Sequence, residues 1–129
     1  MIEIDRCLAS FVAGETFAST DLGKAVNIDA TDSTDQNLAV EFAGAGELCL
    51  GVLKSYEVAG KTVAVAIEGA VTALAGAAIA ENEWVKVGSS GKFIPVASNN
   101  DQAAGFALSI ASADGEFFLL MINRCFYGA

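Results

Sequence analysis

Three aspartates, Asp29, Asp32 and Asp35, recur at every third position in the stretch DATDSTD, where clustered carboxylates could bind a cation. The common calcium-binding loop places its acids two residues apart and adds a glycine and a closing glutamate. The stretch has neither that spacing nor those two residues. Carboxylates among serines and threonines are typical of a solvated turn, so we predict no metal site here.

The segment Gly88-Ser-Ser-Gly91-Lys92 is similar to the end of a phosphate-binding loop. Such a loop needs four residues between its glycines and a serine or threonine after its lysine. Only two residues separate Gly88 from Gly91, and Phe93 follows Lys92. The segment also lies between two predicted strands, so we interpret it as a hairpin turn.

The chain contains no histidine, so Ser–His and Cys–His nucleophile pairs are impossible within one copy. With sixteen acidic residues, pairs of carboxylates arise by chance, and Glu68, Glu81 and Glu83 stand out only as charges near predicted strand ends. We therefore predict no catalytic residue, no cofactor and no metal site. The protein is expected not to be an enzyme.

Cys7, Cys49 and Cys125 are widely spaced and form no CxxC motif. This pattern favours reduced thiols in a protein made in the cytoplasm, and leaves open one bridge with a third thiol unpaired. The N-terminus carries acids where a signal peptide would be basic. The longest uncharged stretches, of 12 residues, are too short for a membrane-spanning helix.

Charge and length narrow the class of partner. The 129 residues include seven basic and sixteen acidic side chains, and the formal net charge is −9. Such a surface repels phosphate, so we expect neither nucleic acid nor an anionic membrane as a partner. The length points to one domain, and a hydrophobic fraction of 53 % argues against global disorder. Any tight partner must offer apolar surface or basic groups.

Short apolar runs separated by glycine and polar turns predict an all-β fold, a small β-barrel or sandwich. The expected strands are residues 22–28, 37–42, 48–54, 61–67, 70–74, 84–87, 92–96, 104–110 and 116–123. Only Gly76–Glu83 indicates a short helical turn, and a kink is expected at Gly69. We assign residues 21–129 to this single domain and residues 1–20 to a less regular N-terminal arm or edge strand.

Two predicted strands alternate large with small apolar residues. In KTVAVAI, Val63, Val65 and Ile67 share one face, and Ala64 and Ala66 share the other. A solvated face would carry polar side chains, so a small apolar face predicts a closely approaching neighbour. The same reasoning divides LCLGVLK into two faces, Leu48, Leu50 and Val52 against Cys49, Gly51 and Leu53.

The last predicted strand is large and apolar on both faces. One face carries Phe117, Leu119 and Met121, and the other carries Phe118, Leu120 and Ile122. Leaving such side chains in water would forgo about 1.5–3 kcal/mol each, so both faces should be buried. The second face is covered either by another subunit or packed arm, or within one chain if the strand is central in a sandwich.

The N-terminal segment and the single tryptophan leave similar alternatives. The segment carries large apolar residues that either pack on their own domain or dock elsewhere. Trp84 fits core packing, a partner anchor, or a ligand-stacking platform. In a carbohydrate-binding or adhesive β-domain, the platform would comprise Trp84, Phe93, Tyr56 and Tyr127.

Three strings in order resemble segments of the small capsid decoration, or cement, proteins of tailed bacteriophages. They are KTVAVAIEGAVTAL, GAAIAENEWVKVGSSGKFIPVA and AAGFALSIASADGEFFLLMIN. The resemblance covers roughly residues 47–123. Asn82 stands where that family commonly has a glycine, and the C-terminus adds NRCFYGA.

The resemblance implies a β-barrel-like domain that forms homotrimers on the exterior of the virion capsid and stabilises the expanded shell. The implied partners are the major capsid protein and further copies of the chain. A tail or fibre component of the virion remains an alternative. We expect deletion of residues 1–17 to abolish capsid binding and leave the domain folded. The candidate contacts with capsid or protomers are Ile2, Ile4, Leu8, Phe11, Val12, Phe17, Trp84, Phe118, Leu120 and Ile122.

Overall fold

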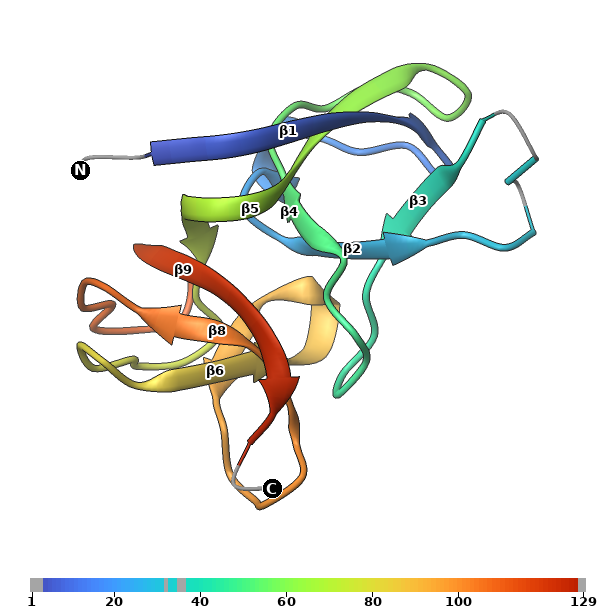
Figure 1. Cartoon of the computed structure of the whole chain (residues 1–129). Coiled ribbons are helices and arrows are strands. Elements are labelled where there is room, and N and C mark those ends of the chain that lie inside the picture. The colour runs from blue at the N-terminus through green and yellow to red at the C-terminus, as the bar shows by residue number, and fades with distance from the viewer. Residues whose placement is uncertain (1–3, 32, 35–36, 128–129) are drawn as a thin grey trace.

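The computed structural model describes residues 4–31, 33–34 and 37–127, and over these residues it is all-β, which confirms the predicted fold class (Figure 1). Two 3-10 turns, η1 (Ser19–Asp21) and η2 (Ser89–Gly91), are the helical elements in that part of the chain. None of its helical segments is long and apolar enough to cross a membrane. The strands are β1 (Ile4–Ala13), β2 (Ala25–Ile28), β3 (Ala39–Phe42), β4 (Gly51–Leu53), β5 (Thr62–Leu74), β6 (Trp84–Val87), β7 (Phe93–Pro95), β8 (Gln102–Ala107) and β9 (Phe117–Phe126).

Five strands close into a barrel, seen in the upper half of Figure 1. The order around the barrel is β1–β3–β2–β4–β5, and β5 pairs back with β1. Strand β1 runs parallel to β3 and antiparallel to β5, and its pairing with β5 extends from Ile4 opposite Ala70 to Val12 opposite Thr62, with register shifts on both sides of Cys7. Closure gives β1 a hydrogen-bonded neighbour on both sides.

Residues 4–13 are therefore a barrel strand, and not an arm that reaches away from the domain. The amide of Val12 donates to the carbonyl of Leu38 at 2.9 Å. Phe17 follows the strand and is only 2 % exposed, in the barrel core. Deleting residues 1–17 would remove both a strand and a core side chain, so from the structure we expect the remainder not to fold.

Strand β5 extends beyond the barrel and begins a second sheet. It bends at Gly69, whose φ of +98° favours glycine, as the predicted kink requires. From Ala70 onward it pairs with β9, and the order continues β9–β8–β6–β7. The two predicted hairpins, β6–β7 across GSSG and β8–β9 across ASADG, are both antiparallel pairs.

Two hydrophobic cores follow from this arrangement. The barrel core contains Ala13, Phe17, Val26, Val40, Leu53, Val63 and Val65. The second core joins the outside of the barrel to the second sheet, because it contains Ala66 of β5 and Val52 of β4 together with Phe118 and Leu120 of β9. The neighbour predicted for the small apolar face is thus largely the chain's own second sheet, which approaches closely where the barrel offers alanine.

The predicted faces of LCLGVLK are partly wrong. Cys49 and Val52 both lie in the second core, whereas Leu50 packs with Leu53 against the barrel core. Leu48 is 51 % exposed. Strict alternation requires an extended strand, and only Gly51–Leu53 of this run is one.

The predicted helical turn at Gly76–Glu83 is also wrong. Ile79 forms an isolated bridge with Ala111, with reciprocal amide-to-carbonyl hydrogen bonds of 2.8 and 3.0 Å. Ile79 is 1 % exposed, so burial in the second core outweighs the helix preference of the surrounding alanines. Asn82 has a φ of +64°, a left-handed conformation that ends any regular run there.

We expect the two cysteines with described side chains to differ in reactivity. Cys49 is buried, and burial raises the pKa of its thiol to about 12, whereas Cys125 is exposed. Iodoacetamide at pH 8 should therefore label Cys125 at least about 100-fold faster than Cys49, as read by peptide mass mapping. In denaturant the two rates should converge, and equal labelling of the native protein would contradict the buried position of Cys49.

The raised pKa of Cys49 also sets a pH dependence. The folded thiol keeps its proton up to about pH 12, whereas the unfolded thiol ionises near its ordinary pKa of 9.0. The contribution of Cys49 to stability is complete below pH 9 and declines as the pH rises through this window. A Cys49→Ala variant should lack this component of the alkaline loss.

Candidate interaction surface

The second sheet carries a row of apolar residues on the side that faces away from the core. Ala70 lies opposite Met121, Met121 opposite Phe106, and Phe106 opposite Trp84, so one row crosses β5, β9, β8 and β6. Directly opposite residues share a face of a sheet. Ile4 of β1 lies opposite Ala70 in the strand register.

The two ends of the row differ in burial. Ala70 is 4 % exposed, whereas Met121, Phe106 and Trp84 are each partly exposed. The rings of Trp84 and Phe106 pack edge to face with centroids 5.3 Å apart. This packing holds two aromatic side chains in fixed orientations on the outside of the sheet.

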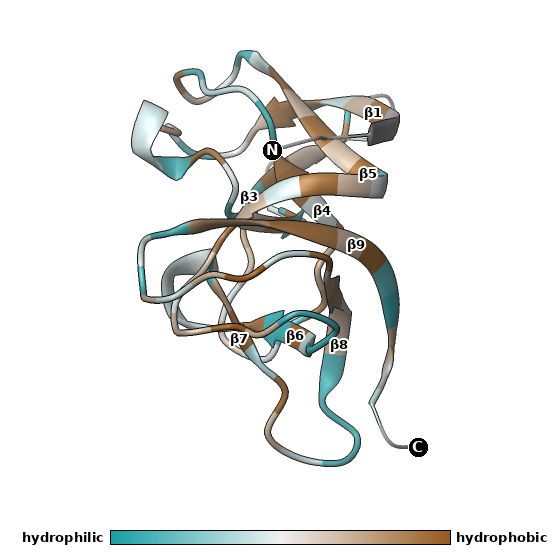
Figure 2. Cartoon of the chain, turned by 90° about the vertical axis from the view of Figure 1, so that its left-hand side faces the viewer, coloured by the Kyte–Doolittle hydropathy of each residue, from teal (hydrophilic) through white to brown (hydrophobic). Residues whose placement is uncertain are grey.

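A second line of apolar side chains runs along β9 itself. Leu119 and Phe117 alternate with the core residues, opposite Thr72 and Leu74 of β5. Phe117 is 50 % exposed, and Figure 2 shows β9 as an almost continuous hydrophobic ribbon across the molecule. We define the outer apolar face as the accessible side chains Thr72, Trp84, Phe106, Phe117, Leu119 and Met121.

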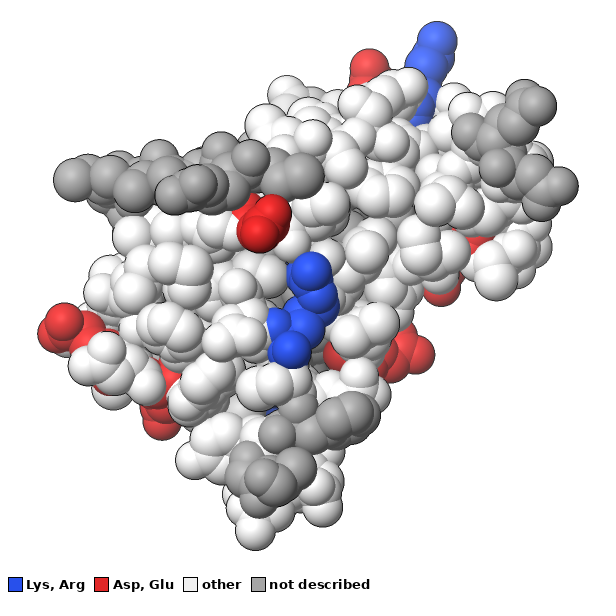
Figure 3. Space-filling view, viewed as in Figure 1, with Lys and Arg blue, Asp and Glu red and all other residues white. Residues whose placement is uncertain are grey.

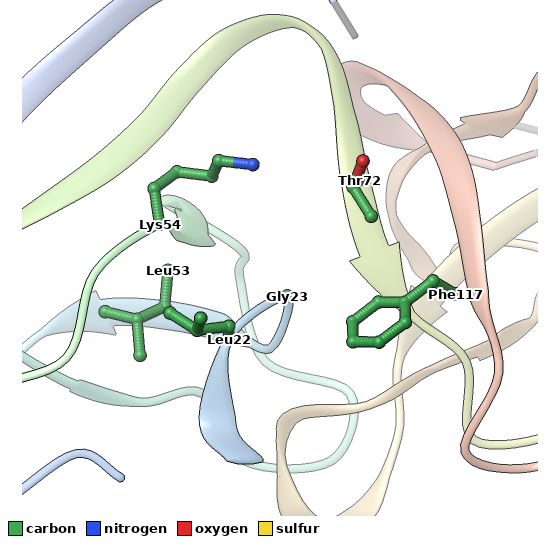
Figure 4. A pocket seen from close by; sticks show the side chains of 6 residues that line it. All are labelled: Leu22, Gly23, Leu53, Lys54, Thr72 and Phe117. Atoms are coloured by element: carbon green, nitrogen blue, oxygen red, sulfur yellow. The ribbon is translucent and has the colours of Figure 1, made fainter. Parts of the chain in front are cut away.

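A shallow pocket of about 240 Å³ adjoins the outer apolar face at Phe117 (Figure 4). Figure 4 shows the Phe117 ring directed toward Gly23, with the Lys54 side chain across the pocket. A side chain at Gly23 would meet the Phe117 ring at 3.1 Å and the backbone of Leu74 at 3.0 Å. Glycine at this position, with a φ of +91°, leaves the floor of the pocket open.

The ten candidate contact residues have different locations. Phe118 and Leu120 are fully buried in the second core, Phe17 is buried in the barrel core, and Ile122 packs partly buried against the second core. Phe118, Leu120 and Phe17 are thus core residues in the folded chain. Phe11 and Val12 are partly buried, Leu8 is 54 % exposed, and Trp84 lies on the outer apolar face. Ile2 and the side chain of Ile4 lie outside what the structure describes.

Sequence reasoning named Phe118, Leu120 and Ile122 of the last strand as contacts, whereas the accessible side chains of that strand include Phe117, Leu119 and Met121. The alternation itself was visible, but both faces looked equally apolar. Phe106 was not named because its run, AGFALSI, contains no charged residue that would identify an outward side.

The motifs that could carry chemistry lie in or beside turns. Asp29 is 6 % exposed, and its Oδ1 accepts a hydrogen bond from the amide of Thr31 at 3.0 Å within a turn; Asp32 and Asp35 lie outside the described residues. In the parts of the chain that the structure describes, no group of three potential metal ligands converges. Lys92 follows the η2 turn and forms an ion pair with Asp114 at 3.1 Å. Phe93 is fully buried, so the aromatic platform of a carbohydrate-binding domain is not assembled as predicted.

Comparison with known proteins identifies the family. A family model described as phage cement protein matches residues 20–122. The chain belongs to the phage cement protein family. It is accordingly a structural component of a phage virion.

A solved structure shares the fold of this cement protein. The head fibre gp8.5 N base of bacteriophage phi29 matches with a TM-score of 0.73 at 17 % sequence identity, over 95 % of this chain and 100 % of that chain. At this identity the likeness demonstrates a common fold. No curated protein sequence matches the chain significantly.

Arg124 ties the two halves of the cement protein together. One guanidinium nitrogen of Arg124, at the end of β9, donates to the carbonyls of Leu50 at 2.9 Å and Ile67 at 3.2 Å. Both acceptors belong to the barrel side, so the bonds fix the second sheet against the barrel. Figure 3 shows a mostly uncharged face, with one basic group near its centre and scattered acidic groups.

Proposed function

We propose that this cement protein binds the outer surface of a phage capsid as a homotrimer and stabilises the expanded shell, with the major capsid protein as its partner. The family match over residues 20–122 is the observation that carries the proposal. The solved structure with the same fold is a head fibre base, and is thus also a phage head protein by its description. The exposed apolar side chains supply surface for protein contacts.

The proposed mechanism is mechanical. Packaged DNA presses outward on the shell, and a trimer that spans several capsid subunits adds contacts that must break before those subunits separate. Each specific contact should bury on the order of 1,000 Å² or more. Three linked contacts per trimer gain avidity without any single contact being strong.

The barrel half of the molecule offers a surface for the capsid contact. Leu8, Tyr56 and Val58 are each more than half exposed, at 54 %, 52 % and 53 %. Leu8 lies on β1, and the other two lie between β4 and β5. We propose that the exposed side of β1 takes the capsid role first predicted for an N-terminal arm.

Co-sedimentation with phage heads tests the proposed function. Purified protein should bind expanded empty heads to saturation, in a copy number divisible by three, and should bind unexpanded heads at least about tenfold more weakly. Decorated heads that carry DNA should release it at a higher temperature than undecorated heads. Absence of binding to expanded heads, or binding with no gain in head stability, would contradict the proposal.

The alternative of a fibre component is favoured by one observation, the match to the head fibre base. A fibre base at a few unique sites would give a small, fixed copy number per virion, whereas a cement protein covers the shell. Counting copies per virion by quantitative gel densitometry, with immunogold labelling for location, separates the two.

A further inference from the structure

We propose that the outer apolar face is the surface through which copies of this chain contact one another in the trimer. The inference rests on the proposed function, because it assigns the contact between protomers within the proposed trimer. Its occupant is a second copy of the chain, and not the capsid. Three features of the sequence and the structure support this assignment.

The first feature is that the side chains which make up the face are uncharged. All six of its members, Thr72, Trp84, Phe106, Phe117, Leu119 and Met121, are uncharged, in a chain of net charge −9. Two identical acidic molecules can approach closely only where neither presents a carboxylate, because a like-charged pair that loses its water is strongly unfavourable. An apolar contact between copies avoids that cost and gains from burial.

The second feature is the division of charge between the two halves of the chain. Residues 1–68 hold eleven acidic and four basic side chains, a net charge of −7, whereas residues 69–129 hold five acidic and three basic ones, a net charge of −2. The outer apolar face lies in the second of these halves. Copies that meet through it bring together the less acidic half of each chain, which lowers the repulsion between them.

The third feature is that the basic side chains of the second half are already engaged. Lys86 pairs with Asp101 at 3.0 Å, and Lys92 pairs with Asp114 at 3.1 Å. A hydrogen bond from the Ser98 amide, with others from Lys86 and Ala97, holds the pKa of Asp101 below its usual value. These two lysines are therefore not free to pair with an acidic partner surface.

The pocket beside Phe117 gives the contact a place for an inserted side chain. It opens next to Thr72 and Phe117, both of which belong to the outer apolar face. Interfaces concentrate their binding energy where a large side chain enters such a pocket. Phe117 is therefore the residue whose replacement should weaken the contact most.

Sedimentation equilibrium of two matched variants tests the inference. Phe117→Glu and Tyr56→Glu replace aromatic side chains of nearly equal exposure, 50 % and 52 %, and add the same charge. Wild type and Tyr56→Glu should be trimeric at micromolar concentration, and Phe117→Glu should dissociate at least about 30-fold more readily. A Phe117→Glu protein that is as trimeric as wild type would overturn the inference. So would a wild-type protein that stays monomeric up to about 200 µM.

Two further measurements keep the result decisive. Circular dichroism must show the same β signal for each variant, and if Phe117→Glu fails to fold, Phe117→Ala replaces it with an expected weakening of about tenfold. Raising NaCl should leave the trimer intact or strengthen it, because no ion pair holds it together. A trimer that dissociates tenfold more readily in high salt would contradict an apolar contact.

Head binding, measured on the same proteins, separates this inference from the proposed function. If wild type binds expanded heads while Phe117→Glu remains trimeric, the inference fails and the proposed function stands. If wild type is trimeric through Phe117 but ignores heads, the inference stands and the proposed function fails.

Discussion

Phe118→Ala is expected to lower the free energy of unfolding by about 3–5 kcal/mol, whereas Phe117→Ala, one residue away, should lower it by less than about 1 kcal/mol. Phe118 is fully buried in the second core, with its ring edge-on to that of Phe93 at 6.1 Å between centroids. Removing it leaves a cavity between β9 and the barrel. Phe117 points outward and is 50 % exposed, so its loss leaves no enclosed cavity.

Urea unfolding of both variants in dilute solution measures this difference, because dilution minimises the linkage between association and stability. The two phenylalanines share a strand and a residue type, so each is the control for the other. Equal losses of stability, or a larger loss for Phe117→Ala, would mean that Phe118 is not the one of the two side chains that faces the core. The same pair should behave oppositely in self-association, where Phe117 is the sensitive position.

Deletion of residues 1–13 should abolish the cooperative fold. The deletion removes β1, which pairs with β5 from Ile4 opposite Ala70 to Val12 opposite Thr62 and also lies parallel to β3. The barrel would open, and the edges of β3 and β5 would lose their hydrogen-bonding partners. Small domains have only about 5–15 kcal/mol of stability, which the loss of a whole strand exceeds.

The measurement is thermal unfolding followed by circular dichroism, together with size-exclusion chromatography. We expect the shortened chain to show no sharp transition and to aggregate through its uncovered barrel core. Deletion of residues 1–3, which precede β1, is the matched control and should retain a sharp transition. If the chain without residues 1–13 melts cooperatively near the wild-type temperature, β1 is dispensable and an N-terminal arm must be reconsidered.

Several elements were predictable because their signals are local. Alternation along KTVAVAI and the turn residues in GSSG and ASADG depend on neighbours within a few positions, and the corresponding strands and hairpins are present. The expectation at Gly69 also held, because a left-handed backbone conformation is a property of that one residue. The helical turn at Gly76–Glu83 failed because alanine content is a weak local preference, and the burial of Ile79 against distant Ala111 overrode it.

The pairing of β1 and the covering of the small apolar face depended on contacts between residues that are distant in the sequence. The N-terminal residues 4–13 showed no clean alternation, yet the barrel needs a strand between β3 and β5, and tertiary pairing supplies it. Ala66 and Cys49 gave a correct indication of a close neighbour, but that neighbour is the chain's own second sheet.

By itself, the sequence determined that this is an acidic all-β chain without histidine chemistry, and that its β-strands carry more apolar surface than polar surface. Only the tertiary structure decided which apolar side chains are inside: Phe118 and Leu120 are buried, while Phe117 and Leu119 face outward. The physical reason is that alternation separates the two faces of a strand, but only packing against other strands decides which face meets the core.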